Sequence, residues 1–390
     1  MKKGKIMFNL LAMAAGILTL CISGTRAQEP GTLNIGMVTS ITGPMAPGFK
    51  GLYDAVEPTR RLLNQRGGVT VNGRKYLINV IVEDDKSSPA GAVAAANKLI
   101  QDKVRFIVAP IFMVAFKAMN PTTQEAKVIL VEPMTGDPTL VGPYNFIALM
   151  SGYYVPTIYE KLQSAYPQVH KIAIVMPDDP GVYSMRDLVV KEINKRNLEI
   201  VSREFFKIGT QDFYPILTKV LEKKPDAIEC VASIVPWSAG IINSARELGF
   251  SGPIYCATPF GDIHQLNHMI KPEYADDIFH GAPDVLGDDM TPIIKDLRKL
   301  IEKDLKKPMS MENTLCLGAL YPLLQAIEEA DTFDTEVVAA TWEKMEHIDT
   351  IFGKGEMAGK ELAGINHIVR GPVPYSQIMD GVIEGEIIEE

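Results

Sequence analysis

Short, uninterrupted apolar runs alternate with helical patterns along most of the chain. Runs at 33–38, 76–82, 106–109 and 128–131 read as strands, and stretches such as 51–66 and 89–101 read as helices. A strand that is buried on both faces has no polar side to alternate with its apolar one. Runs of this kind between amphipathic helices therefore indicate a parallel sheet with helices on both faces.

The pattern then occurs a second time. Strand-like runs follow at 146–150, 172–176, 198–205, 227–232 and 254–257, with helical segments between them, one of them at about 183–195. Residues 284–342 are mainly helical in pattern, and short strands separated by Gly and Pro follow. We therefore predict an α/β fold of two doubly wound parallel-sheet lobes, with the change of lobe near 149–152.

The loops after the predicted strands are the expected binding region. In open parallel sheets, ligands bind beyond the carboxyl ends of the strands, where helix N-termini present free N–H groups. If the lobes face each other, these loops form one cleft. The candidate loops are 40–43, 110–114, 133–137, 177–184, 233–238 and 258–262.

The N-terminal segment has the layout of a secretory leader. Lys2, Lys3 and Lys5 precede an apolar run at 10–22, and small residues lead to a cleavage site near Ala27. The run is shorter than the roughly 20 residues of a spanning helix, so an uncleaved anchor is less favoured, as is a lipid on Cys21. We predict export to the periplasm.

The net charge limits the binding partners to be expected, and the cysteine content leaves the disulfide state open. The chain carries −9, and removing the leader, with four basic residues and no acids, leaves −13. An acidic protein of this kind is not expected to bind nucleic acid or anionic membranes. Three cysteines remain after the leader, and a Cys230–Cys256 disulfide and buried free thiols both stay open.

Enzyme signatures are weak. The chain lacks Gly-x-Gly-x-x-Gly at the first strand–helix junction and lacks a phosphate-binding Gly-x-x-x-x-Gly-Lys-Ser/Thr stretch. Pro236-Trp237-Ser238-Ala239-Gly240 lacks the first Gly of a nucleophile elbow, so we expect Ser238 to cap a helix. We expect Asp84-Asp85 to cap the following helix as well, rather than to act as a catalytic carboxylate pair.

A metal site is also disfavoured. His264 and His268 are one helical turn apart with Asp262 nearby, a spacing that can bring ligands together. The Glu of the hydrolytic His-Glu-x-x-His pattern is missing, so a polar helix face is the favoured interpretation. We predict no catalytic residues, no metal and no cofactor.

Several segments, in order and spacing, support a family resemblance. They are Thr42-Gly43-Pro44, Asn64-Gln65-Arg66-Gly67-Gly68, Val82-Glu83-Asp84-Asp85, Lys171-Ile172-Ala173-Ile174-Val175, Gln211-Asp212-Phe213, Lys224-Pro225-Asp226 and Ala245-Arg246-Glu247-Leu248-Gly249. With these segments the chain resembles the periplasmic solute-binding proteins of branched-chain amino acid importers, the leucine/isoleucine/valine-binding type.

The resemblance implies a monomeric, two-lobed receptor with a three-segment hinge. It implies that the lobes close on a small-molecule ligand and that the closed form docks on the membrane permease subunits of an ABC importer. The predicted divisions are a leader at 1–27, one lobe at 28–149 plus 283–368, and the other at 150–282 plus 369–390. A sensor of the same fold that signals through a separate chain is the alternative function, and an exported hydrolase or metal enzyme is a third.

Three positions depart from the amino acid-binding pattern. Members that bind amino acids use a Ser after the third strand, a Thr after the fourth and an acid in the second lobe. The matching positions here hold Met113, Gly136 (with Thr135 before it) and Thr258. Because a buried ammonium without an acidic partner is costly, we expect a small carboxylate with an apolar or aromatic body. Asp178-Asp179 keeps an amino compound open.

The candidate ligand-binding residues all lie in the predicted cleft loops. Packing in the core is the alternative for each large apolar one. The set is Thr42, Phe112, Met113, Met134, Thr135, Gly136, Tyr183, Ser233, Trp237, Thr258 and Phe260.

Overall fold

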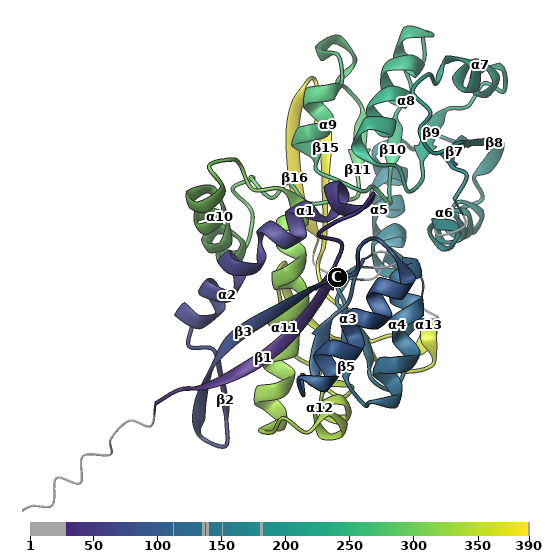
Figure 1. Ribbon diagram of the computed structural model, residues 1–390. Coiled ribbons are helices and arrows are strands. Elements are labelled where there is room, and N and C mark those ends of the chain that lie inside the picture. The colour runs from purple at the N-terminus through teal and green to yellow at the C-terminus, as the bar shows by residue number, and fades with distance from the viewer. Residues whose placement is uncertain are drawn as a thin grey trace, which may run out of the picture.

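The computed structural model describes residues 29–111, 113–134, 137, 140–149, 151–179 and 182–388. Its strands form two sheets, one in each half of the molecule (Figure 1). The larger sheet has the order β12-β13-β14-β6-β5-β4-β1-β3-β2, and the smaller has the order β16-β15-β11-β10-β9-β7-β8. Most consecutive parallel strands are joined by crossover helices. The predicted fold class, two doubly wound α/β lobes, is confirmed.

The larger sheet is parallel at its centre. Its central strands are β3 (Arg74–Asp84), β1 (Gly31–Thr39), β4 (Phe106–Val108), β5 (Ile129–Glu132) and β6 (Asn145–Ile147). The edges are antiparallel, with β2 (Val69–Val71), β13 (Gly353–Ala358) and β12 (Ile348–Thr350), while β14 (Ile368–Arg370) runs parallel to β6.

Helices cover both faces of the larger sheet. The helices α3 (Pro89–Gln101) and α4 (Met113–Glu125) share one apolar core with it. On the other face lie α1 (Ala46–Asp54), α2 (Val56–Gln65), α10 (Pro292–Leu305), α11 (Leu315–Ala330) and α12 (Thr335–Trp342). The single helix predicted at 51–66 is thus wrong: two helices, α1 and α2, meet at Ala55.

The smaller sheet is also mixed. Its parallel strands are β8 (Glu199–Phe206), β7 (Lys171–Pro177), β9 (Ala227–Cys230), β10 (Ile254–Cys256) and β11 (Ile278–His280). The strands β15 (Val373–Met379) and β16 (Val382–Ile388) add an antiparallel edge. One face packs on α5 (Ser151–Ala165) and α6 (Tyr183–Lys195), and the other on α7 (Tyr214–Glu222), α8 (Val235–Glu247) and α9 (Ile263–Met269).

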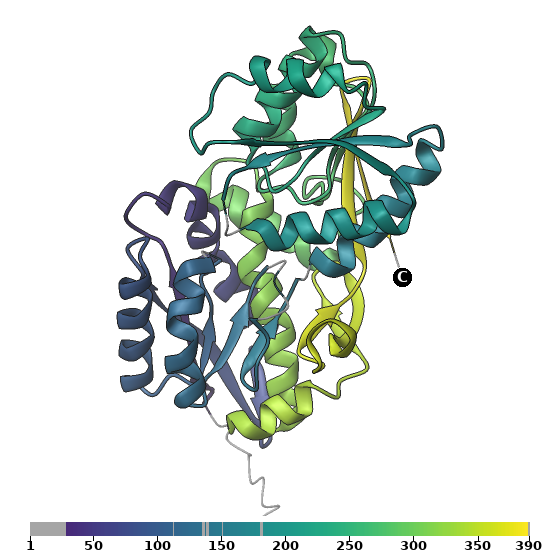
Figure 2. The same cartoon turned by 90° about the vertical axis from the view of Figure 1, so that its right-hand side faces the viewer.

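The chain passes between the halves three times. It crosses between β6 and α5, between β11 and α10, and at Gly371-Pro372 between β14 and β15. The two halves therefore lie one above the other and are tied by three adjacent segments (Figure 2). The antiparallel edge of the smaller sheet arises from this last crossing, because the chain re-enters that sheet through the hairpin β15–β16.

Two predicted helix caps are wrong. The N-cap of α3 is Ser88, whose hydroxyl accepts a hydrogen bond from the Gly91 N–H, and not Asp84-Asp85. The N-cap of α8 is Ile234, and Ser238 is buried one turn inside the helix. Proline at the start of each helix explains the shift, because proline has no N–H and fits the first turn.

The cysteines after the predicted leader are free and buried, and Cys230 lies beside Cys256 on adjacent strands. Within the described ranges, none of the helices combines the length and apolarity of a membrane-spanning segment. The predicted leader at 1–27 lies outside the described residues.

Candidate functional site

A small, partly enclosed space, which we term the hinge cavity, lies where the three crossing segments meet. Its volume is about 30 Å³, close to the volume of one water molecule in the liquid. Its walls come from both halves and are apolar apart from two hydroxyl groups. They comprise Met134, Leu149, Tyr154, Met185, Ala257, Thr258, Pro259, Gly281, Ala282, Pro283, Met311, Phe352 and Pro374.

Thr258 lines this cavity, as does Met134 among the other predicted residues. The Thr258 hydroxyl accepts a hydrogen bond from the Ala232 N–H at 3.0 Å. Ala232 has a left-handed φ of 50°, a conformation that costs a non-glycine residue energy. Thr258 therefore holds the turn after β9 in place, and its hydroxyl proton is still available to a ligand.

Ser233 and Phe260 connect the loops after β9 and β10. The Phe260 N–H donates to the Ser233 carbonyl oxygen at 3.0 Å, and Ile234 forms a parallel bridge with Phe260. The Ser233 hydroxyl is buried and donates to the Val231 carbonyl oxygen at 3.4 Å. The two loops thus continue the β9–β10 pairing beyond the strands and move as one unit.

An aromatic pair, which we term the aromatic edge, lies at the carboxyl ends of β7 and β8. It consists of Tyr183 and Phe205. The Tyr183 hydroxyl donates to Asp178 Oδ1 at 2.8 Å, which raises the pKa of Tyr183. Its ring lies 6.4 Å from that of Phe205, whose side chain is exposed. Trp237 is partly buried and packs against the core beneath α8.

One cation accompanies the aromatic edge. The Arg186 guanidinium lies 4.4 Å from the centroid of the Tyr183 ring, on the first turn of α6. Its ionic partner is the neighbouring Asp187, at 2.7 Å, whose side chain is 66% exposed. The Arg186 side chain is 26% exposed, and a pair of neighbouring residues that reaches solvent contributes little, so the guanidinium can exchange this partner for another carboxylate. The sequence analysis missed Arg186, because nothing in the sequence distinguishes it from a solvated arginine.

Carboxylates hold the first cleft loop of the larger-sheet half. The Thr42 hydroxyl donates to Asp84 Oδ2 at 2.6 Å, and the Ile41 and Thr42 N–H groups donate to Asp84 Oδ1. Burial opposes ionisation, but these bonds lower the pKa of Asp84. Ser40 binds Asp85 in the same way, at 2.6 Å. The two carboxylates therefore tie loop 40–43 to the end of β3.

The remaining predicted residues of this half lie elsewhere. Met113 opens α4 and packs against the core between α3, α4 and the sheet rather than in the hinge cavity. Phe112, Thr135 and Gly136 lie outside the described residues.

Two buried glutamates are the main polar features that sequence reasoning missed. Glu229 accepts the Ala257 N–H at 3.0 Å and the Tyr159 hydroxyl at 2.8 Å, and burial raises its pKa to about 7. Glu132 ends β5, is 1% exposed, and neither of its carboxylate oxygens meets a donor at normal geometry. Burial raises the pKa of Glu132 well above its usual range. In the sequence, the signal for each of these glutamates is a single acid within or at the end of an apolar strand run.

Asp262 makes a contact between the two halves. Its Oδ1 caps α9 by accepting the His264 N–H at 2.9 Å. Its Oδ2 accepts the Met311 N–H, at 3.2 Å, from the short helix η4 (Met311–Thr314) that leads into α11. The His264 ring instead binds Asp284, at 2.6 Å, while the His268 ring binds the His264 carbonyl oxygen. In the described part of the chain, no group of three or more potential ligands is placed to hold a metal ion.

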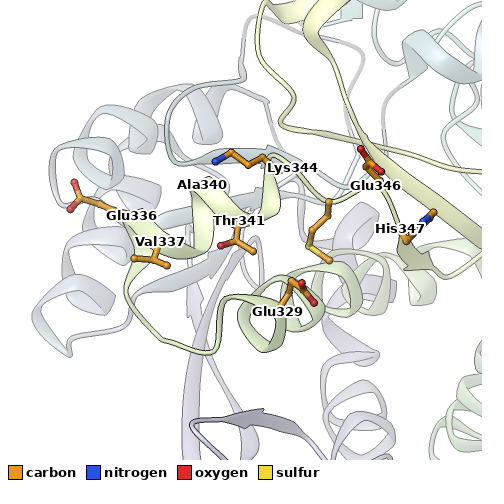
Figure 3. A pocket seen from close by; sticks show the side chains of 9 residues that line it. Glu329, Glu336, Val337, Ala340, Thr341, Lys344, Glu346 and His347 are labelled. Atoms are coloured by element: carbon orange, nitrogen blue, oxygen red, sulfur yellow. The ribbon is translucent and has the colours of Figure 1, made fainter.

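A larger hollow of about 750 Å³ lies on the outer side of α12, away from both sheets' carboxyl ends. Figure 3 shows its lining side chains, with Glu336 and Val337 at one end and Glu346 and His347 at the other. It is shallow and mixed in charge, and it contains none of the predicted residues.

Two halves that carry their loops toward each other around a three-segment hinge define a two-lobed binding protein. Residues 32–371 match the family model described as "Periplasmic binding protein". The chain belongs to this family of binding proteins, in agreement with the prediction that it is not an enzyme.

The similar proteins are distant but nearly full in length. The Leu/Ile/Val-binding protein of Escherichia coli (strain K12) is 22% identical over 361 residues, covering 90% of this chain and 94% of that protein. Among solved structures, the substrate-binding protein LivJ from Streptococcus pneumoniae in complex with isoleucine has a TM-score of 0.73 at 19% identity, covering 92% of this chain and 100% of that one. A solute-binding protein from R. palustris in complex with benzoate has a TM-score of 0.69 at 17% identity, covering 92% and 98%.

Proposed function

We propose that this protein is the periplasmic receptor of an ABC importer of the branched-chain amino acid type. Its ligand is a small carboxylate with an apolar or aromatic body rather than a standard amino acid. The two lobes predicted at 28–149 plus 283–368 and at 150–282 plus 369–390 close on it, with the last boundary moved to Gly371-Pro372 because Val369 and Arg370 belong to β14 of the larger sheet. The closed, monomeric form docks on the permease subunits.

The aromatic edge with Arg186 is the observation that carries this proposal. Guanidinium groups bind carboxylates through two parallel hydrogen bonds, and a partly exposed arginine held over a ring is positioned to do so. The rings of Tyr183 and Phe205 offer faces and edges to an aromatic body. Both features lie at the carboxyl ends of parallel strands, where such folds bind ligands.

The hydroxyl groups support the same ligand class. An amino acid receptor needs free donors for the carboxylate and an acid for the ammonium. The Thr42 hydroxyl donates to Asp84 and is therefore not a free donor for a carboxylate, and Thr258 stands where the amino acid-binding pattern has an acid. Asp178 is occupied by the Tyr183 hydroxyl. Two solute-binding proteins of similar fold, from R. palustris and Rhodopseudomonas palustris BisB5, are complexes with benzoate and with 3,4-dihydroxy benzoic acid.

The small size of the hinge cavity supports a binding position between the lobes rather than inside the cavity. At about 30 Å³, it is far below the roughly 300–1,000 Å³ of a small-molecule site. The body of the ligand therefore lies between the aromatic edge and the facing loops, and hinge motion adjusts the space. The hinge cavity forms the floor of that site.

Ligand screening by thermal unfolding tests the proposal. The protein purified from the periplasmic fraction is mixed with benzoate, 4-hydroxybenzoate, aliphatic acids, leucine, isoleucine and valine. An acid at about 100 times its Kd adds about 2.7 kcal/mol to the free energy of unfolding, which shifts the melting temperature measurably. We expect stabilisation by aromatic acids and not by the amino acids.

Substitution of Arg186 tests the carboxylate contact. Arg186→Gln is expected to weaken benzoate binding at least tenfold by calorimetry, because the bidentate donor is lost. Arg203→Gln, which changes an exposed arginine on β8, serves as the matched control. Stabilisation by leucine alone would contradict the ligand class. Unchanged uptake of the identified ligand after deletion of the gene would contradict the transport role.

A further inference from the structure

The hinge cavity has one side chain that touches the cores of both halves. The ring of Tyr154, on the first turn of α5, packs against the apolar core of the larger-sheet half and against the core formed by α5, α6 and the smaller sheet. The same ring lines the hinge cavity. Tyr154 is therefore placed where the first crossing segment enters the smaller-sheet half, between the two bodies that the hinge joins.

The hydroxyl of Tyr154 has no partner. Burial alone raises its pKa, and no side chain or backbone group in the described part of the chain hydrogen-bonds it. Buried hydroxyl groups of tyrosine usually find a partner. The hydroxyls of Tyr159 and Tyr166 bind Glu229 and Asp277, whereas the buried Tyr255 has no hydroxyl hydrogen bond within the described ranges. Tyr154 is half-buried, so its unpaired hydroxyl is free to bond a group that enters the hinge cavity.

A second hydroxyl faces the same space. Thr258 lines the hinge cavity, and its oxygen accepts the Ala232 N–H, which leaves the hydroxyl proton free to donate. The other walls are aliphatic, aromatic or thioether groups. A volume of about 30 Å³ admits one hydroxyl, methyl or water molecule and excludes a ring.

The position of α6 relates the cavity to the carboxylate contact. Met185 lines the hinge cavity, and Arg186 is the next residue of the same helix. Successive residues of an α-helix point about 100° apart, so Met185 faces the hinge while Arg186 faces the aromatic edge. One molecule lying across this turn of α6 meets a cation at one end and two hydroxyl groups at the other.

We propose that the hinge cavity is a subsite for one hydroxyl substituent of the ligand, at the end opposite its carboxylate, and that the hydroxyl of Tyr154 recognises it. The inference rests on the proposed carboxylate receptor and narrows its ligand to hydroxylated aromatic acids. The ligand hydroxyl donates to Tyr154 or accepts from it, and Thr258 supplies the second hydrogen bond. Recognition at this point connects ligand binding with the only side chain we find that packs on both cores among the described residues.

Calorimetry with three ring-substituted acids tests the subsite. Benzoate, 4-methylbenzoate and 4-hydroxybenzoate share the carboxylate and the ring and differ in the group that would enter the cavity. The wild-type protein is expected to bind 4-hydroxybenzoate at least tenfold more tightly than the other two, because a site built to bond a hydroxyl rejects analogues that lack it. In Tyr154→Phe this preference falls below about threefold, while benzoate binding is unchanged within about twofold.

A control variant separates this role from general stability. Tyr153→Phe makes the same chemical change one residue earlier, where the hydroxyl donates to Glu361 at 2.5 Å and the side chain lies outside the cavity lining. It is expected to keep the tenfold preference, and the melting temperature of each unliganded variant reports its folding.

The outcomes distinguish the two proposals. Benzoate binding without any preference for the hydroxylated acid, or a preference that persists in Tyr154→Phe, overturns the subsite and leaves the carboxylate receptor standing. Equal affinity for the methyl and hydroxyl acids also overturns it, since the cavity would then be an apolar or water-filled space. Failure of every aromatic acid to bind overturns both proposals.

Discussion

Replacing Glu229 by Gln should remove a large pH dependence from the stability of the smaller-sheet half. Burial raises the pKa of Glu229 from 4.5 to about 7. The native protein therefore holds this proton up to about pH 7, whereas the unfolded chain releases it near pH 4.5. Between these values the native state binds more protons, so stability falls as the pH rises.

The magnitude follows from the two pKa values. A rise from 4.5 to about 7, at about 1.4 kcal/mol per pH unit, amounts to about 3 kcal/mol of stability that is present at pH 4.5 and lost by pH 8. Glu229→Gln carries no titrating proton, and its amide can still accept from Ala257 and can donate to the Tyr159 oxygen. Between pH 4.5 and about pH 8, the free energy of unfolding of the variant should therefore rise by about 3 kcal/mol relative to that of the wild type.

Urea unfolding at a series of pH values measures this difference. Glu132, whose pKa is also raised by burial, is present in both proteins and cancels from the comparison. The exposed Glu222 on α7 gives a control, since Glu222→Gln should run parallel to wild type at every pH. A constant difference between wild type and Glu229→Gln across the range would refute the assignment of a buried, protonated carboxyl.

Three other substitutions have expected effects on stability or local opening. Trp342→Ala should cost about 3–5 kcal/mol in urea unfolding, since the indole is fully buried and stacks 4.1 Å from a phenyl ring; a cost below 1 kcal/mol would contradict this packing. Thr258→Val should lower the free energy of unfolding by about 1–3 kcal/mol, because the buried Ala232 N–H is left unpaired. Thr258→Ser keeps the hydroxyl acceptor and should retain most of this stability. Asp84→Asn should speed hydrogen exchange at the Thr42 amide several-fold because a carboxylate acceptor is lost, with no change expected in α12.

Elements with strong local signals could be predicted residue by residue. The helices at 89–101 and 183–195 have the same bounds in the structure as in the sequence analysis. In the first, Ser88 and Pro89 set the N-terminus locally. The short apolar runs likewise predicted the central strands, because burial on both faces leaves a pattern that no distant partner alters.

Features that depend on distant partners could not be predicted. Asp84 looks like a cap in sequence, but its partner Thr42 is 42 residues away and is brought near by the β1–β3 pairing. Met113 and Met134 are equivalent loop methionines in the sequence, yet one packs under α4 and the other lines the hinge cavity. The hinge cavity itself is built from three crossing segments, and no stretch of the sequence contains a signal for it.

The carboxylate of Asp262 ends a helix in each half at once, through the amides of His264 and Met311. Only the bond from the Met311 amide joins the two halves, and that amide carries a single exchangeable proton. If the halves separate as proposed, that proton meets solvent while the His264 proton remains protected. The ratio of the two amide exchange rates would then report how often the halves open, and no label would need to be attached to the protein.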